Sequence, residues 1–129
     1  MFDFSLISDN ASVLLRGLAL TVQICAMGIC LSLIGGGLLL AFRSCLGRGS
    51  AWLYDVYVTV FRGTPFLVQI YLVYFGGPYI GLDFSAEVVG IVGLAMYGSA
   101  YFAEIFRAGV EAISRGQLEA ARDLGLTRQ

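Results

Sequence analysis

The chain lacks lysine and histidine altogether, and it carries few charges of either sign. All eight of its basic residues are arginines, and charged residues make up only 13% of its 129 residues. Without lysine there is no Walker-type phosphate loop, and without histidine there is neither a His-based metal site nor a Ser-His-Asp triad. We therefore predict no catalytic residue, no metal site and no cofactor, and we expect any ATP-driven work from another polypeptide.

Apolar residues dominate what is present. They make up 58% of the chain, against about 45–50% in ordinary soluble domains. Residues 17–42 contain no charge, and as a helix this stretch would extend roughly 39 Å, more than a hydrocarbon core of roughly 30 Å. A membrane-spanning helix is thus favoured over a buried soluble one, and the fold class we predict is all-α, a multi-pass transmembrane helical bundle.

Three membrane spans are predicted, at about residues 17–42, 66–82 and 88–106. Residues 1–16 precede them, and residues 107–129 form the start of a polar loop after them. Between the first two spans, the aromatic stretch 51–61 suits either a headgroup-level segment or the lead-in to a span. Pro65 fits the first turn of the second span, and Gly76-Gly77-Pro78 predicts that this span unwinds near its end.

Small residues repeat along the first span. Gly28, Ser32 and Gly36 lie four residues apart on one helix face, a spacing that lets helix backbones approach closely in a bilayer. We interpret them as a helix–helix contact. The run Gly35-Gly36-Gly37 fits either a hinge or tolerated packing, and the three cysteines are interpreted as small apolar packing residues.

The arginines predict the orientation. With the N-terminus outside, seven of the eight fall on the cytoplasmic side, as the positive-inside rule requires; they are Arg43, Arg48, Arg62, Arg107, Arg115, Arg122 and Arg128. The opposite orientation leaves a single arginine inside, so we expect an N-terminus outside.

The C-terminal segment predicts a short, separate helix. Gly116 is expected to end the helix of the third span, and residues 117–124 to form a new helix with Gly125 at its C-terminal cap, where a left-handed conformation is cheapest. Ala120 and Ala121 give this helix a small surface that can enter a groove on a partner. On physical grounds alone, a solvated amphipathic tail fits equally well.

Three ordered motifs carry a family resemblance. They are Arg62-Gly63-Thr64-Pro65 followed by Gln69, the stretch 100–107 (AYFAEIFR), and Gly116-Gln117-x-Glu119-Ala120-Ala121 followed by Gly125. From about residue 17 to its end, the chain resembles the permeases of binding-protein-dependent ABC importers. Within that family it is similar to the polar amino acid uptake group, which serves histidine, glutamine, glutamate and arginine.

The resemblance implies a membrane permease subunit that moves polar amino acids by alternating access. Its coupling helix, with Gly116, Gln117, Glu119, Ala120, Ala121 and Gly125, would dock on an ABC ATPase subunit dimer. The other implied partners are a second permease copy or homologue, an extracytoplasmic amino-acid-binding protein, the amino acid and membrane lipid, but no nucleic acid. The implied location is the bacterial inner membrane. The family's domain normally continues past this loop into further spans.

Four residues are candidates for the translocation path. Gln69 either hydrogen-bonds another helix or lines the path. Tyr71 and Tyr101 either contact substrate or serve as packing and lipid-belt aromatics. Glu104, at the inner end of the third span, either pairs with Arg107 or takes part in gating or proton movement.

Two alternatives from other classes remain. A non-transporting anchor or assembly subunit would insert in the membrane without binding an ATPase at residues 119–125. An inactive remnant of a truncated gene would be degraded and show no uptake. A membrane enzyme is disfavoured because no nucleophile–base pair can be assembled.

Overall fold

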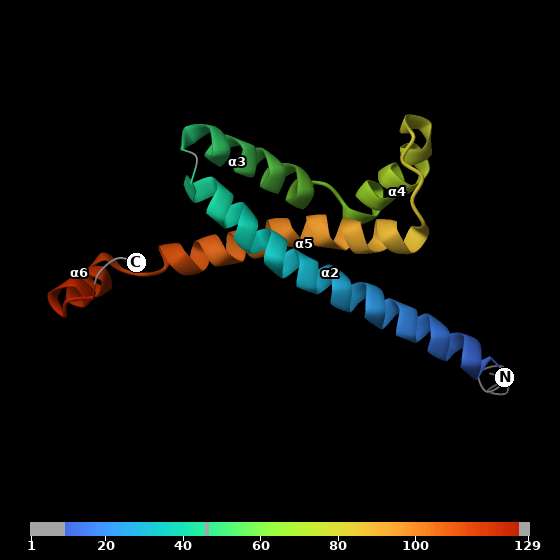
Figure 1. The fold of residues 1–129 in the computed structure, drawn as a ribbon, viewed down its shortest axis with the longest axis horizontal. Helices are drawn as coiled ribbons and strands as arrows, with labels where there is room; N and C mark the ends of the chain where they lie inside the picture. The colour runs from blue at the N-terminus through green and yellow to red at the C-terminus, as the bar shows by residue number, and fades with distance from the viewer. Residues whose placement is uncertain (1–9, 46, 127–129) are drawn as a thin grey trace.

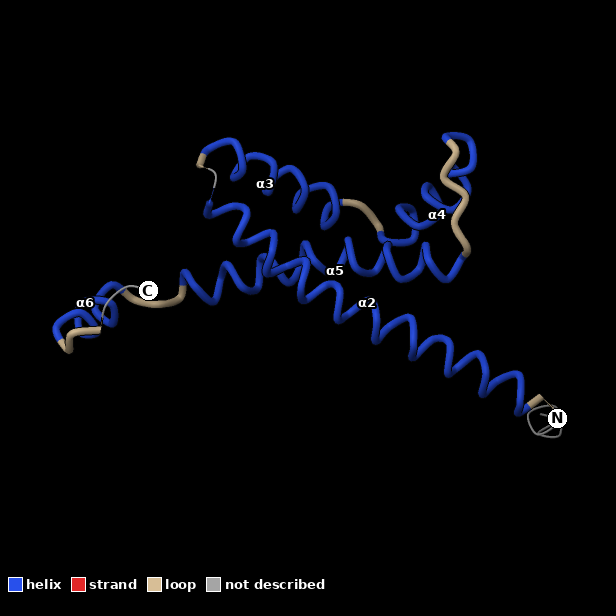
Figure 2. Tube along the Cα trace, viewed as in Figure 1, coloured by secondary structure: helices blue, strands red, loops and turns tan. Residues whose placement is uncertain are grey.

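The computed structural model describes residues 10–45 and 47–126, and within these ranges every regular element is a helix (Figure 1). The elements are α2 (Ala11–Cys45), α3 (Arg48–Gly63), α4 (Phe66–Gly76), the 3-10 helix η1 (Gly77–Ile80), α5 (Ala86–Glu111) and α6 (Arg115–Asp123). Short loops and turns join α3 to α4, η1 to α5 and α5 to α6 (Figure 2). The predicted all-α fold class is confirmed.

The two long helices, α2 and α5, cross each other and form the most extensive contact of the molecule. Their residue numbers rise together along the contact, because Gly28 faces Leu94 and Gly36 faces Phe102. The two helices therefore run parallel. Figure 1 shows the same arrangement, with the N-terminal ends of both helices on one side of the crossing and the C-terminal ends on the other.

Small residues on α2 make this crossing close. The buried residues of α2 are Gly28, Ser32 and Gly36, so the predicted helix–helix contact is confirmed. A Cβ atom at Gly36 would lie 2.7 Å from the Cβ of Phe102 and 2.9 Å from the backbone nitrogen of Ala103. Ser32 adds a polar contact, since its hydroxyl donates to the carbonyl of Leu94 at 3.0 Å.

The glycine run in α2 serves packing. α2 is a single continuous helix through Gly35, Gly36 and Gly37. A Cβ atom at Gly35 would lie 2.9 Å from the Cβ of Ser99, whereas one at Gly37 would meet nothing within 4 Å. Of the two interpretations left open by the sequence, close packing holds for Gly35 and Gly36.

The segment between the long helices brings the chain back to the starting side. Because α2 and α5 are parallel, the chain has to return from the C-terminal end of α2 to the N-terminal end of α5. It does so through α3 and then α4 with η1, which together are long and apolar enough for one span but are bent by 97°. α3 and α4 both pack on α5.

The bend is built by the motif at residues 62–65. Proline disfavours a helical conformation at the residue before it, and Thr64 accordingly has φ −114° and ψ 144°. Pro65 directly precedes α4, and its carbonyl accepts from the backbone nitrogens of Val68 at 3.0 Å and Gln69 at 3.3 Å. α3 thus ends and α4 begins within two residues.

The helices differ in extent from the predicted spans. α2 and α5 are each long and apolar enough to cross a membrane and extend past residues 17–42 and 88–106 at both ends. The second span, predicted at 66–82, is not one helix: α4 has 11 residues, about 17 Å, and the chain tightens into η1 at Gly77–Ile80, where unwinding was expected. Residues 1–9 of the predicted N-terminal segment and Arg128 lie outside the described residues.

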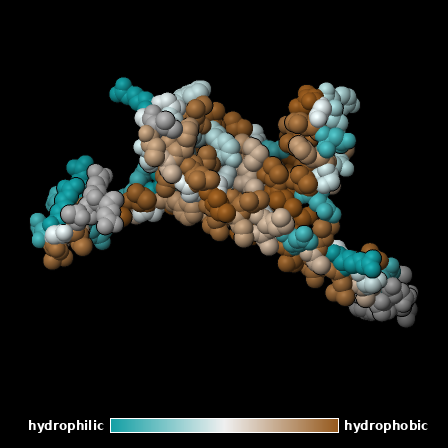
Figure 3. Space-filling model, in the orientation of Figure 1, coloured by the Kyte–Doolittle hydropathy of each residue, from teal (hydrophilic) through white to brown (hydrophobic). Residues whose placement is uncertain are grey.

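The hydropathy of the surface follows this arrangement. Hydrophobic side chains cover the crossing of α2 and α5, and hydrophilic colour gathers on α6 (Figure 3). Leu14, Leu18 and Val22 in the first half of α2 are exposed, where α2 projects away from the other helices (Figure 1).

Candidate functional site

The first candidate site is α6, a short helix whose start is set by its own side chains. Ser114 is the N-cap: its hydroxyl accepts from the backbone nitrogen of Gln117 at 3.4 Å. Gln117 reaches back, and its Oε1 accepts from the backbone nitrogen of Ser114 at 3.3 Å. This reciprocal pair is a capping box, which satisfies two of the backbone donors that a helix start leaves free.

The end of α6 is set by Gly125. Its φ of 78° is left-handed, a conformation that side chains disfavour. The backbone nitrogen of Gly125 donates to the carbonyl of Arg122 at 2.9 Å, and that of Leu126 donates to the carbonyl of Ala121 at 3.0 Å. These two bonds make a Schellman motif, so the four-residue spacing from Ala121 to Gly125 is the one that this helix end requires.

The surface of α6 is unoccupied by the rest of the described chain. α6 lies beyond the C-terminal end of α5, apart from the other helices (Figure 1), and has no buried residue. Glu119 and Ala120 are exposed and Ala121 is half-buried. A shallow pocket of about 260 Å³ lies on this helix, lined by Arg115, Leu118, Glu119 and Arg122.

The position of Gly116 corrects one prediction. The helix of the third span ends at Glu111, and α6 begins at Arg115, so Gly116 lies inside α6 rather than breaking the preceding helix. Its Cβ position is open. The break instead belongs to residues 112–114, where Ser114 starts a new helix. The expected helix at residues 117–124 thus begins two residues earlier and ends at Asp123.

The second candidate site is a polar cluster around Glu104 on α5. Arg107 holds both carboxylate oxygens of Glu104: its Nε donates to Oε1 at 2.9 Å and its Nη2 to Oε2 at 2.9 Å. The predicted pairing of Glu104 with Arg107 is confirmed. A second helix contributes Tyr54 of α3, whose hydroxyl donates to Oε1 of Glu104 at 2.8 Å. Tyr54 is 1% exposed, the largest fully buried side chain among the described residues.

Arg62 joins the same cluster from the last turn of α3. Its Nη1 lies 3.5 Å from Oε2 of Glu104, and its guanidinium carbon lies 5.1 Å from the centre of the Tyr101 ring, within the range of a cation–π interaction. The structure therefore brings together Tyr101 and Glu104, two of the candidate path residues, through a residue of the 62–65 motif.

Gln69 lies at the bend between α3 and α4. Its Nε2 donates to the carbonyls of Phe61 at 3.1 Å and Thr64 at 3.2 Å, and to the Thr64 hydroxyl at 2.5 Å. The end of α3 leaves its last carbonyls without helical partners, and Gln69 satisfies one of them. Two roles were expected for Gln69, and these bonds between α4 and the end of α3 fulfil the first, a hydrogen bond to another helix. The second, a role in the translocation path, stays a prediction.

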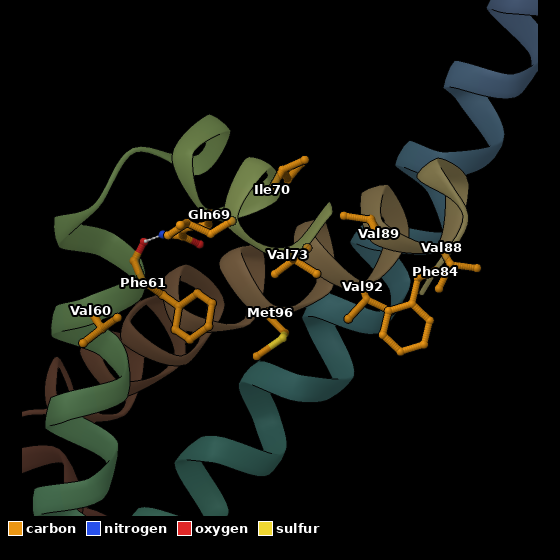
Figure 4. Close-up of a pocket in the computed structure, with 12 residues that line it drawn as sticks. Val60, Phe61, Gln69, Ile70, Val73, Phe84, Val88, Val89, Val92 and Met96 are labelled. Atoms are coloured by element: carbon orange, nitrogen blue, oxygen red, sulfur yellow. Dashed lines mark hydrogen bonds between the residues drawn. The ribbon is translucent and has the colours of Figure 1, made fainter. Parts of the chain in front are cut away.

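A pocket of about 350 Å³ lies between α3, α4 and α5 (Figure 4). Gln69 is the one polar side chain of its lining, and its amide nitrogen is turned toward Phe61 (Figure 4). The remaining lining is apolar, with residues such as Val73, Val92 and Met96. Such a lining suits an apolar occupant, because a charged amino acid would lose its hydration there without gaining partners.

The structure separates Tyr71 from the other path candidates. Tyr71 is exposed on α4 and pairs with Phe75 of the same helix, with ring centres 5.7 Å apart.

Three residues that contribute to these sites were not identified as such from the sequence. Tyr54 of α3 bonds to Glu104, and Arg43 of α2 lies with its Nη1 4.0 Å from Oε1 of Glu111 on α5. Both contacts join residues distant in sequence, which no local pattern reveals. Ser114, by contrast, was signalled by its capping-box spacing to Gln117.

Comparison with known proteins gives a family match over most of the chain. The family described as "Binding-protein-dependent transport system inner membrane component" matches residues 28–129. An arginine transport system permease protein, ArtQ of Bacillus subtilis (strain 168), is 38% identical over 125 residues, covering 96% of this chain and 57% of that protein. A putative glutamine transport system permease protein, GlnP of Rickettsia bellii (strain RML369-C), is 31% identical over 130 residues, covering 99% and 60%.

A solved structure has the same fold. The crystal structure of an amino acid ABC transporter with histidines superposes with a TM-score of 0.90 at 33% identity. The match covers 99% of this chain and 60% of that chain. The chain thus spans somewhat more than half the length of these relatives.

Proposed function

The chain belongs to the family of binding-protein-dependent transport system inner membrane components, and we propose that it is a permease subunit of an ATP-driven importer of polar amino acids. It contributes helices to the translocation path and receives the work of ATP hydrolysis from a separate ATPase subunit. The substrate class rests on relatives named for arginine and glutamine transport and on the 62–65 and 100–107 motifs.

The observation that carries this proposal is the geometry of α6. Both ends of the helix are capped by residues of the coupling motif, Gln117 at its start and Gly125 at its end. A helix of nine residues has little stability by itself. The caps therefore stabilise the helical form of α6, and with it the binding surface, in the absence of the partner. The small apolar side chain of Ala120 can then enter a groove on the ATPase, while the charged Glu119 beside it can bond at the edge of that groove; both residues are exposed.

Transport follows from this arrangement by alternating access. An external binding protein delivers the amino acid to the outer side of the permease, which works with a second permease copy or homologue. ATP binding closes the two ATPase subunits, and their movement displaces α6 and the helices attached to it. Of the proposed path residues, Gln69 lies at the α3–α4 bend, and Tyr101 and Glu104 contact Arg62 in the last turn of α3. Tyr71 is exposed on α4.

The orientation we propose places the N-terminus of α2 outside. Arg43 and Arg107 lie near the C-terminal ends of the parallel helices α2 and α5, and Arg48 begins α3 at the same end, which agrees with the positive-inside rule. The native Cys45, the last residue of α2, is exposed. We expect a membrane-impermeant maleimide to label it in inside-out vesicles and not in intact cells; labelling in intact cells would reverse the orientation.

The test of the function is reconstitution of the native complex in proteoliposomes. We expect uptake of radiolabelled arginine or glutamine only when ATP, the ATPase and the binding protein are all present. Uptake that persists without ATP would contradict the proposal. A chain that inserts but never binds an ATPase would support the alternative of an anchor or assembly subunit.

A further inference from the structure

The inner end of α5 carries a network of charges and hydrogen bonds that joins three helices. Arg107 lies at its centre, and all three of its guanidinium nitrogens donate to carboxylates. Nε and Nη2 donate to Glu104, and Nη1 donates to Oε2 of Glu111 at 2.6 Å. These partners lie three residues before and four residues after Arg107, the spacings at which helix side chains meet. The last two turns of α5 are therefore tied together along the helix.

The same network reaches the neighbouring helices. Tyr54 and Arg62 connect Glu104 to α3. Arg43 of α2 lies with Nη1 4.0 Å from Oε1 of Glu111, and its guanidinium carbon lies 5.1 Å from the centre of the Tyr54 ring. One network thus connects the C-terminal ends of α2 and α5 with α3.

The position of this network matters because of how α6 is attached. α6 has no extended packing on the other described helices, and residues 112–114 link it to the end of α5. A displacement of α6 must pass through that end. If the last turns of α5 could unwind or slide past α3, the displacement would be lost before it reached the bend at residues 62–65.

We infer that Tyr54, Glu104 and Arg107 form a clamp that makes the end of α5 and α3 move as one body, so that displacement of α6 is delivered to the α3–α4 bend. The three are positioning residues for coupling and need not touch the substrate. The inference rests on the proposed function, since it assigns to named residues the transfer of movement from the ATPase to the spans.

Tyr54→Phe tests the clamp with little disturbance. The variant keeps the buried ring and its contact with Arg43 but removes the hydroxyl that reaches Glu104. The matched control is Tyr57→Phe, which removes two hydrogen bonds between α3 and α5, those of the Tyr57 hydroxyl to Ser99 at 2.8 Å and to the Met96 carbonyl at 2.8 Å. Tyr57 lies outside the charged network.

The readout is the number of ATP molecules hydrolysed per amino acid imported by the complex in proteoliposomes. Substitutions along a coupling route change coupling by roughly two- to thirtyfold. We expect this ratio to rise by at least twofold for Tyr54→Phe and to stay unchanged for Tyr57→Phe. An unchanged ratio for Tyr54→Phe, or an equal rise in both variants, would overturn the clamp.

A second variant covers the case in which Tyr54→Phe fails to assemble. Glu111 is 58% exposed at its side chain, so Glu111→Gln should leave folding intact while removing its ion pairs to Arg107 and Arg43. Because Glu111 holds Arg107, a member of the clamp, we expect a smaller rise in the same ratio, and an unchanged ratio would overturn the clamp. If the unaltered complex hydrolyses ATP but imports nothing, the proposed function fails; if it imports normally and the variants are unchanged, only the clamp fails.

Discussion

The crossing of α2 and α5 and the isolated helix α6 hold their shapes by opposite means. At the crossing, the backbones approach closely at Gly28 and Gly36, which have no side chain, and α2 is held there by its contact with Leu94 and Phe102 of α5. In α6 no neighbour helps, and the helix depends on side-chain and glycine caps at Ser114 and Gly125. Glycine in the first region leaves room for a neighbouring backbone, and in the second it allows a left-handed backbone conformation.

The largest expected effect separates two adjacent glycines at the crossing. Gly36→Ala should destabilise the protein by roughly 1–3 kcal/mol, because overpacking forces shifts of that cost and its Cβ would approach the backbone of Ala103. Gly37→Ala, which meets open space, should be neutral or stabilising by up to about 1 kcal/mol. Unfolding midpoints in detergent measure both; equal effects would mean that α2 does not pack as described.

The matching pair in α6 tests the role of conformation. Gly125→Ala places a side chain at a left-handed residue, which costs about 1–2 kcal/mol. If this cost destabilises the helical form of α6 that binds the ATPase, binding should weaken roughly five- to thirtyfold. Gly116→Ala, inside α6 with an open Cβ position, should stabilise the helix by about 0.5–1 kcal/mol and leave binding equal or tighter. Titration of the ATPase against both variants measures this, and weaker binding by Gly116→Ala would contradict the helix start at Arg115.

The N-terminal cap of α6 should have a somewhat smaller effect. Ser114→Ala removes the acceptor of the Gln117 backbone nitrogen, a loss of typically about 1 kcal/mol. Hydrogen exchange in the first turn of α6 should speed up by roughly fivefold. The control is Ser44→Ala, whose hydroxyl bonds only to the Leu40 carbonyl within α2 and should leave α6 exchange unchanged. Unaltered exchange in Ser114→Ala would show that the capping box does not stabilise the start of α6.

The smallest expected effect lies at the bend between α3 and α4, outside both regions. Gln69→Leu removes the hydrogen bonds that the Gln69 side-chain amide donates to Phe61 and Thr64 and places an apolar side chain of similar size against the pocket. Side-chain hydrogen bonds in membrane proteins average about 0.6 kcal/mol, so the unfolding midpoint should fall only slightly. A loss as large as that of Gly36→Ala would make Gln69 a central support of the bend.

The features that the sequence predicts correctly are encoded locally. The four-residue spacing of Gly28, Ser32 and Gly36 reports a helix face, and Gly125 reports a helix end, because each depends on residues within one or two turns. The pairing of Glu104 with Arg107 is visible for the same reason. The capping box at Ser114 is equally local, but treating Gly116 as a helix breaker hides it.

Other features depend on partners that spacing cannot show. Tyr54 and Glu104 are 50 residues apart in sequence, and their hydrogen bond follows from how α3 lies across α5. The parallel course of α2 and α5 already follows from three alternating spans with the N-terminus outside. The sequence does not show that the return between them is a bent pair, α3 followed by α4 with η1, because this pair is held by packing on α5. The placement of Arg62 over the ring of Tyr101 is another consequence of this packing.

The proposed function requires that α6 is the surface that binds the ATPase. The most direct test is cross-linking in a variant whose three native cysteines are replaced, with a single new cysteine at Ala120→Cys in α6 or, as a control, at Tyr79→Cys in η1, 92% exposed at the opposite end of the bundle. We predict that a short bifunctional reagent joins the ATPase to the Ala120→Cys chain and not to the Tyr79→Cys chain. An ATPase that co-purifies with the permease but cross-links only through Tyr79→Cys, or through neither position, would show that α6 is not the ATPase-binding surface.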